Sequence, residues 1–170
     1  YGIYLSSSSD NTVTGNTCNN NNSYGIYLNS SSDNTVTGNT CNNNSSGIYL
    51  NSSSNNTVTG NTCNNNSSYG IRLSSSSNNT VTGNTCNNNN SSGIYLYSSS
   101  NNTVTGNTCI RGTGQTSDYT SSQYTIRLQG TANNYNLISS NNCMGKAVVV
   151  EGGTGNSAWG NKFDATNDLP

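Results

Sequence analysis

Residues 1–23 read YGIYLSSSSDNTVTGNTCNNNNS, and near-copies of this segment begin at Tyr24, Ser46, Tyr69 and Ser92. The same residue types therefore return every 22 or 23 residues. A fixed period of this length is typical of repeat proteins, in which each unit buries its apolar face against its neighbours. The apolar positions that keep this register are Ile3, Ile26, Ile48, Ile71, Ile94, Val13, Val36, Val58, Val81, Val104, Cys18, Cys41, Cys63, Cys86 and Cys109.

The residue types of the repeat predict short strands and exclude helices. Asn, Ser, Thr and Gly are poor helix formers, and no apolar residues recur at helical spacing. Runs at residues 2–5, 12–14 and 17–19 place apolar between polar residues, as in a strand with one buried face. The segments between them are rich in turn-forming residues. The expected fold class is all-β: a single-stranded right-handed parallel β-helix, a solenoid of about seven coils with three short strands each.

The predicted core is thin. Ile3, Leu5, Val13 and Cys18 would point inward in the first coil, and their equivalents would stack above them. Each large buried side chain contributes about 1.5–3 kcal/mol, so polar ladders must add stability. Asn16 and its equivalents follow a glycine at the same bend, and stacked amides there are expected to hydrogen-bond along the axis.

We expect one domain over residues 1–170. Residues 1–109 are near-identical coils, residues 110–122 form an inserted loop, and residues 123–170 form degenerate closing coils. In the last of these, Phe163 stands at the cysteine position. Trp159 is expected to help close the core at this end.

The consensus of the repeats, GIYLSSSSNNTVTGNTCNNN, resembles the right-handed parallel β-helix repeat of carbohydrate-active and surface proteins. It is most similar to that of the periplasmic copper-binding β-helix family and of repetitive archaeal surface proteins. The resemblance covers essentially the whole chain and implies this fold. For function it leaves lyases, hydrolases, adhesins and structural proteins open.

The six cysteines follow the repeat, and the chain has neither a CxxC motif nor a histidine. A zinc site is therefore not supported. One cysteine per coil leaves two structures open: a ladder of buried thiols, or disulfides between adjacent coils. We expect no metal and no cofactor.

Charged residues make up 6% of the chain, and the net charge is −1. There is no basic patch and no apolar run of membrane-spanning length, so we expect neither nucleic-acid binding nor membrane insertion. The chain opens on a repeat without an initiator Met, which we interpret as a mature product or an excerpt of a longer array. The composition favours an extracellular or cell-surface location. Asn55, Asn78 and Asn101 share one position of the repeat and are possible glycosylation sites.

Catalysis on sugars usually needs two converging carboxyl groups. The acidic residues are Asp10, Asp33, Asp118, Glu151, Asp164 and Asp168. Asp10 and Asp33 share a turn position that reads Asn in later repeats, so we interpret them as solvated turn residues. One charged grouping, Arg127, Lys146 and Glu151, resembles that of lyases. The spacing does not show in which direction these three side chains point. We expect no catalytic residue and no enzyme; if the chain is an enzyme, it is a polysaccharide lyase or hydrolase.

Two outward positions of the repeat are candidate binding surfaces. The first is an aromatic and basic column that could stack against sugar rings, or simply stabilise the sheet. Its members are Tyr4, Tyr27, Tyr49, Arg72, Tyr95 and Arg127, with Tyr1, Tyr24, Tyr69 and Tyr124 beside them. The second is a grid of hydroxyls and methyls similar to that of ice-binding β-helices. Its members are Thr12, Thr14, Thr35, Thr37, Thr57, Thr59, Thr80, Thr82, Thr103 and Thr105.

These observations favour a non-enzymatic extracellular structural or adhesive module that forms part of a filament or surface layer. The open ends of a β-helix expose unpaired strand edges, so we expect self-association by head-to-tail stacking. The first alternative is a carbohydrate-binding or carbohydrate-processing domain that uses the Tyr/Arg face. The third hypothesis is ice binding through the Thr-x-Thr face.

Overall fold

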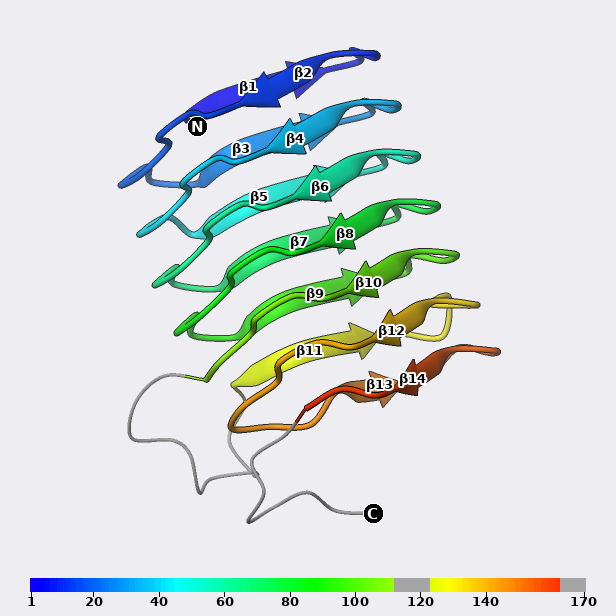
Figure 1. Cartoon of the computed structure of the whole chain (residues 1–170). Coiled ribbons are helices and arrows are strands. Elements are labelled where there is room, and N and C mark those ends of the chain that lie inside the picture. The colour runs from blue at the N-terminus through cyan, green and yellow to red at the C-terminus, as the bar shows by residue number, and fades with distance from the viewer. Residues whose placement is uncertain (112–122, 163–170) are drawn as a thin grey trace.

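The structure, a computed structural model, describes residues 1–111 and 123–162 as a stack of short strands (Figure 1). The strands are β1 (Ile3–Ser6), β2 (Thr12–Thr14), β3 (Tyr24–Asn29), β4 (Thr35–Thr37), β5 (Ser46–Asn51), β6 (Thr57–Thr59), β7 (Tyr69–Ser74), β8 (Thr80–Thr82), β9 (Ser92–Tyr97), β10 (Thr103–Thr105), β11 (Tyr124–Gln129), β12 (Leu137–Ser139), β13 (Val149–Glu151) and β14 (Ser157–Trp159). Within the described part of the chain, no helix is long and apolar enough to cross a membrane.

The strands form two parallel seven-stranded sheets, which we call sheet A and sheet B. Sheet A has the order β1-β3-β5-β7-β9-β11-β13, and sheet B the order β14-β12-β10-β8-β6-β4-β2. Equivalent residues of successive coils pair directly, as Ile26 with Ile48 and Val36 with Val58. The chain therefore alternates between the sheets and climbs one strand per coil (Figure 1). The predicted parallel β-helix is confirmed.

The third run of each coil is shorter than expected. Thr17, Thr40, Thr62, Thr85 and Thr108 are joined along the stack only by isolated parallel bridges. Two corners confine this run: the bend at Gly15 before it and the left-handed residue Asn20 (φ 58°) after it. The space between them is too short for a strand, so each coil has two strands and one bridge.

The apolar residues face inward as predicted. Ile and Leu of sheet A, Val of sheet B and the cysteines of the third side form one core, in which most members are fully buried. Ile26, Leu28, Val36 and Cys41 represent one coil of it, and each has 0% of its surface exposed. In each coil sheet A contributes two apolar side chains to the core, whereas sheet B and the third side contribute one each. The corners must therefore contribute much of the remaining stability.

Each regular coil turns at four left-handed residues. In the first coil they are Ser7 (φ 47°), Asp10 (φ 60°), Gly15 (φ 66°) and Asn20 (φ 58°). Apart from glycine, which has no Cβ, Asn and Asp adopt this conformation more readily than other residues. Each left-handed residue is followed by a polar residue, and from the second coil on these following side chains are buried. The corners thus aim one polar side chain after another into the stack.

The buried amides at these corners form the predicted ladder. The backbone N–H and Nδ2 of Asn39 both donate to Oδ1 of Asn61, at 2.9 and 3.0 Å. Asn39 Nδ2 also donates to the carbonyl oxygens of Val13 and Thr37, each at 3.0 Å. Its own Oδ1 accepts from the backbone N–H and Nδ2 of Asn16. Every polar atom of the buried amide is therefore satisfied.

Two further asparagine ladders were not predicted from the sequence. They have the same geometry, and they stand at the corners that follow the left-handed Asp10 and Asn20 positions. The first contains Asn11, Asn34, Asn56, Asn79, Asn102, Asn136 and Asn156, and the second contains Asn21, Asn44, Asn66 and Asn89. At the fourth corner a serine ladder is built in the same way, with Ser31 N–H donating to Ser53 Oγ at 3.0 Å. Side chains therefore tie the coils together at every corner.

The cysteines are free and buried in a single column. This matches the thiol-ladder alternative of the sequence analysis. Burial raises the pKa of the Cys86 thiol well above its usual value and that of Cys143 to about 12. The column acts as a set of small apolar side chains, and burial opposes the ionisation of Cys86 and Cys143.

The expectation for Trp159 was wrong. Trp159 pairs with Ser139 on the outer side of sheet B and is 59% exposed, whereas Ala158 occupies the inward position beside Ile138. Strand alternation, and not side-chain size, decides the facing. Of the inserted loop expected at residues 110–122, residues 112–122 lie outside the described residues, as does Phe163.

Asn55 and Asn56 are neighbours in the chain, and because Asn56 is buried in a ladder while Asn55 is exposed, they form a matched pair for mutation. Replacing buried Asn56 with Ala leaves the backbone N–H and Nδ2 of Asn34 without their acceptor, which should lower the free energy of unfolding by about 3 kcal/mol or more. Replacing the exposed, left-handed Asn55 with Asp, the residue found there in the first two coils, should change it by less than about 0.5 kcal/mol. Urea denaturation of both variants checks this. Equal effects would contradict the ladder's energetic role.

Thiol burial predicts a stability loss at alkaline pH. The folded pKa values of Cys86 and Cys143 lie above the unfolded value of about 8.5, so their contribution is complete below pH 8.5 and is lost as the pH rises beyond it. Each such thiol should remove about 1.4 kcal/mol per pH unit from the free energy of unfolding. Denaturation between pH 7 and 9.5 in reductant measures the slope. Cys86→Ala and Cys143→Ala should each flatten it; an unchanged slope in both would refute the prediction.

Candidate functional site

The aromatic and basic residues predicted to share one surface do so. Tyr4 pairs with Tyr27, and Tyr27 with Tyr49, on the outer side of sheet A. Arg72, Tyr95 and Arg127 continue the same line. We call these six residues the Tyr/Arg column. In-register pairing alone aligns them, because one position of the repeat is brought directly above the next.

The rings of the column stack on one another. Tyr4 and Tyr27 have centroids 5.1 Å apart at 9°, and Tyr27 and Tyr49 have centroids 5.1 Å apart at 13°. Tyr49 is consequently only 8% exposed. Its hydroxyl donates to Asn51 Oδ1 at 3.2 Å, as that of Tyr27 does to Asn29. The column therefore offers hydroxyls and ring edges to a ligand, and most ring faces are already covered.

A second line of rings flanks the column. Tyr24 meets Tyr27 edge-on at 5.1 Å, and Tyr69 stacks on Tyr95 at 4.7 Å. Burial raises the pKa of the hydroxyls of Tyr24, Tyr27 and Tyr95. These groups remain neutral hydrogen-bond donors across the physiological range.

Arg72 interrupts the rings and lies against them. Its guanidinium carbon is 4.6 Å from the Tyr49 ring centroid and 5.4 Å from that of Tyr69, within the range of cation–π attraction. Its Nε is buried and has no hydrogen-bond partner. The planar group is thus held by ring contacts.

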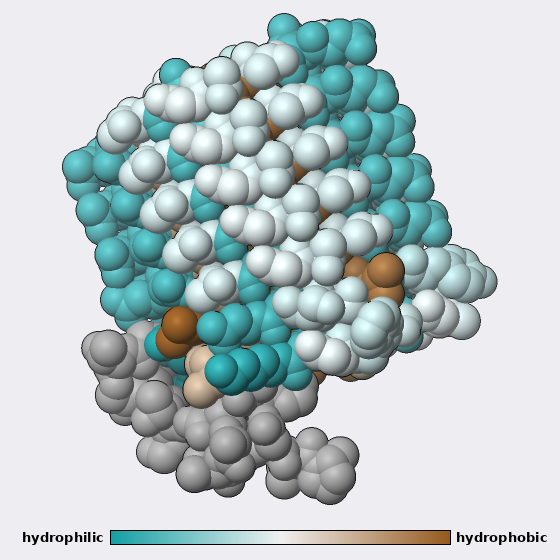
Figure 2. Space-filling view, viewed as in Figure 1, coloured by the Kyte–Doolittle hydropathy of each residue, from teal (hydrophilic) through white to brown (hydrophobic). Residues whose placement is uncertain are grey.

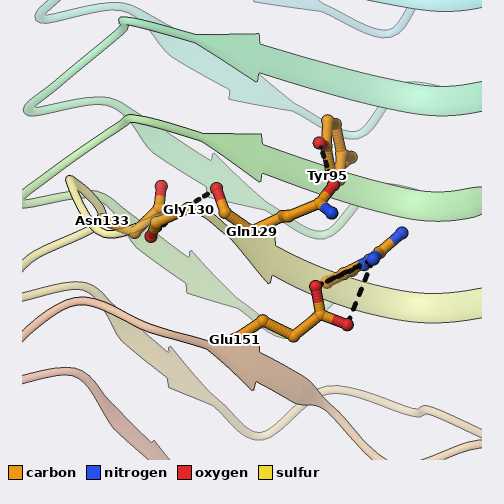
Figure 3. A network of polar contacts seen from close by, with 6 residues as sticks. Tyr95, Gln129, Gly130, Asn133 and Glu151 are labelled. Carbon is orange, nitrogen blue, oxygen red and sulfur yellow. Dashed lines mark hydrogen bonds and ion pairs between the residues drawn. The ribbon is translucent and has the colours of Figure 1, made fainter.

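Arg127 has a different environment. Its guanidinium lies 4.3 Å from the Tyr124 ring. Its Nε and Nη2 donate at 2.8–3.1 Å to the carboxylate of Glu151, which is labelled in Figure 3. Although burial opposes it, the Glu151 carboxylate raises the pKa of Arg127. Lys146 Nζ lies 3.9 Å from the Tyr124 ring. The sequence grouping of Arg127, Lys146 and Glu151 is therefore brought together, around Tyr124.

Sequence reasoning missed Tyr97. It stands two residues beyond Tyr95 on β9 and is 45% exposed, with its ring 6.4 Å from that of Tyr95. The equivalent residues of the neighbouring strands are Ser74 and Gln129. Gln129 Oε1 accepts a 2.6 Å hydrogen bond from the Tyr95 hydroxyl (Figure 3). In the four coils before it this position is Ser or Asn, and the departure at Tyr97 was the signal that could have found it.

The carboxylates among the described residues are Asp10, Asp33 and Glu151. Asp10 and Asp33 are exposed left-handed corner residues, and Glu151 is engaged by Arg127. Asp118, Asp164 and Asp168 lie outside the described residues. Within the described part of the chain there is also no pocket.

The other predicted surfaces have the expected facing. The paired threonines of sheet B lie outside in register, and their columns run along the stack (Figure 2). Thr82 Oγ1 is engaged by the carbonyl oxygen of Thr105 at 2.9 Å. Ice binding by this array stays a prediction that a thermal hysteresis assay would test. Asn55, Asn78 and Asn101 are exposed at left-handed corners, and their glycosylation likewise stays a prediction.

The fold and its outer surface define a parallel β-helix repeat protein with one flat aromatic and basic face. A family model described as "Periplasmic copper-binding protein (NosD)" matches residues 1–116. The chain belongs to this NosD family. No curated protein sequence is a significant match to it.

Solved structures share the fold. The Dettilon tailspike protein has a TM-score of 0.71 at 22% identity over 91% of this chain and 38% of its own. A double mutant of the periplasmic alginate epimerase AlgG has a TM-score of 0.63 at 20% identity, over 95% of this chain and 42% of its own. A bacteriophage CBA120 tailspike domain has a TM-score of 0.56 at 16% identity, over 81% and 22%. The chain thus spans less than half the length of these proteins.

The family description names copper, so the side chains of this chain that could bind a metal ion matter here. Copper in proteins is held by thiolate, thioether and imidazole ligands. The chain has no histidine, and its described residues contain no group of three or more His, Cys, Asp or Glu side chains that could hold a metal ion. The thiols lie in the apolar core. The residues described here do not fit a copper centre.

Proposed function

We propose that this chain is an exported, non-catalytic β-helix module that binds polysaccharide on the outer face of sheet A. The observation that carries the proposal is the Tyr/Arg column. Along it, tyrosine hydroxyls and ring edges recur at the spacing of the strands, together with a guanidinium, on a flat surface. Sugars are recognised by aromatic rings that pack on their C–H faces and by polar groups that bind their hydroxyls.

The flat shape favours a long ligand. Strands of sheet A are about 4.8 Å apart, so a chain molecule can meet one repeat after another. Each contact would be weak, and binding would gain strength from their number. The absence of a pocket among the described residues fits a polymer better than a small molecule.

The structural neighbours support the substrate class. They include phage tailspikes, an alginate epimerase and an alginate lyase from Paenibacillus with a TM-score of 0.50 at 15% identity. The non-catalytic part of the proposal rests on the carboxylates described above: Asp10 and Asp33 are exposed at a corner position that later coils fill with Asn, and Glu151 is engaged by Arg127. Location outside the cytoplasm, in the periplasm or at the surface, is supported by the family description.

Self-association by head-to-tail stacking remains part of the proposal. The inward asparagine ladders are directional, because each amide oxygen accepts from the coil before it. The amide oxygens of the first coil, on Asn11, Asn16 and Asn21, can therefore accept from N–H groups of another chain that stacks on this end. Sedimentation over a range of concentrations tests this: growing mass supports stacking, and a constant monomer mass contradicts it.

A glycan array with the wild-type chain, followed by titration calorimetry, tests the proposed function. Tyr97→Ser, which restores the residue found at Ser74, should weaken binding about two- to ten-fold through loss of an exposed ring. The matched control is Tyr135→Asn, which removes an exposed tyrosine at a corner away from sheet A and restores the residue found at Asn101. It should bind as the wild type does. No binding to any glycan, or equal loss in both variants, would contradict the proposal.

A further inference from the structure

Arg72 has an unusual environment. Among the described arginines, it is the one whose guanidinium makes neither a hydrogen bond nor an ion pair with the protein. Rings of Tyr49 and Tyr69 hold the group from its own side of the sheet. The side chain as a whole is half-buried, and Nε is the guanidinium nitrogen that is buried without a partner. A positioned guanidinium whose terminal nitrogens are not engaged by the protein is a donor fork for a planar anion.

The same column contains an internal precedent for its ligand. Arg127 stands two coils further on in the same position, also against a tyrosine ring, and binds the carboxylate of Glu151 through two nitrogens. Glu151 pairs with Gln129, two residues beyond Arg127. A guanidinium of the column therefore binds a carboxylate when the next coil supplies one beside it.

The corresponding place beside Arg72 holds no acid. Ser74 lies two residues beyond Arg72 on β7, and Tyr97 of the next coil pairs with it. Tyr97 is 45% exposed, and so a ligand can reach its ring. The Oγ of Ser74, on the same face of β7 as Arg72, is buried without a hydrogen-bond partner. Arg72 therefore has an accessible ring as its neighbour in the place where Arg127 has its carboxylate.

We propose that Arg72 and Tyr97 form a subsite for an acidic sugar residue, in which the guanidinium binds the ring carboxylate and Tyr97 packs against the sugar. The inference rests on the proposed polysaccharide-binding function and names its ligand class: a polymer that contains uronic acids. The carboxylate is favoured over a sulfate ester because Glu151 shows which anion fits the column.

The test uses paired ligands and a variant that the repeat itself supplies. The probes are an oligouronate, its methyl ester, in which the carboxylate is neutralised, and a sulfated neutral oligosaccharide of equal length. The variant Arg72→Tyr restores the residue that the adjacent coils carry at Tyr49 and Tyr95, so the fold should be kept. Arg72→Lys keeps the charge but loses the planar fork. Calorimetry at low and physiological salt measures each affinity, and urea denaturation checks each fold.

The wild type should bind the oligouronate about ten-fold more tightly than its methyl ester. Arg72→Tyr should abolish that difference while ester binding stays, and Arg72→Lys should retain only part of it. Equal affinity of Arg72→Tyr and wild type for the oligouronate would overturn the subsite but leave the proposed function intact. A loss confined to the sulfated probe would overturn the carboxylate assignment. Failure of the wild type to bind all three probes and every glycan of an array would overturn both proposals.

Discussion

The structure depends on the buried asparagine amide that hydrogen-bonds along the stack. A coil with one apolar side chain on two of its three sides has little hydrophobic energy, and its corners carry buried backbone groups that need partners. The amides of Asn34, Asn39 and Asn44 supply those partners, since each joins its own coil to the coils before and after it. Each ladder needs an inward polar side chain at the same corner of every coil, so the ladder depends on the repeat.

The ladder also determines the outer surfaces. Because each coil is held directly above the next, a position of the repeat becomes a straight column, and a substitution at one position becomes a local feature of a uniform face. Arg72 and Tyr97 are two such substitutions on adjacent strands of sheet A. The regular coils provide a rigid, repeated support, and the departures from the repeat provide the chemistry that distinguishes one part of the face from another.

Periodicity was sufficient to predict the inward Ile, Val and Cys columns, because a strand has only two sides and the repeat fixes which is buried. It also predicted the ladder after Gly15, since glycine marks the left-handed corner. The ladders that contain Asn34 and Asn44 were missed because asparagine-rich segments do not reveal locally which amide turns inward. Tyr97 was missed for a related reason: its relation to Arg72 depends on pairing between coils. The Trp159 error came from judging by size, although its alternation with Ala158 indicated an outward side chain.

Hydrogen exchange of the asparagine side-chain amides measures whether the ladders hold the coils together. NMR with selectively labelled asparagine can compare the Nδ2 hydrogens of buried Asn39, Asn56 and Asn66 with those of exposed Asn55 and Asn65. If the ladders hold the coils together, the buried side-chain amides exchange as slowly as the backbone amides of sheet A, and the exposed ones exchange at the rate of free asparagine. Fast exchange at the buried positions, with sheet A still protected, would contradict this account.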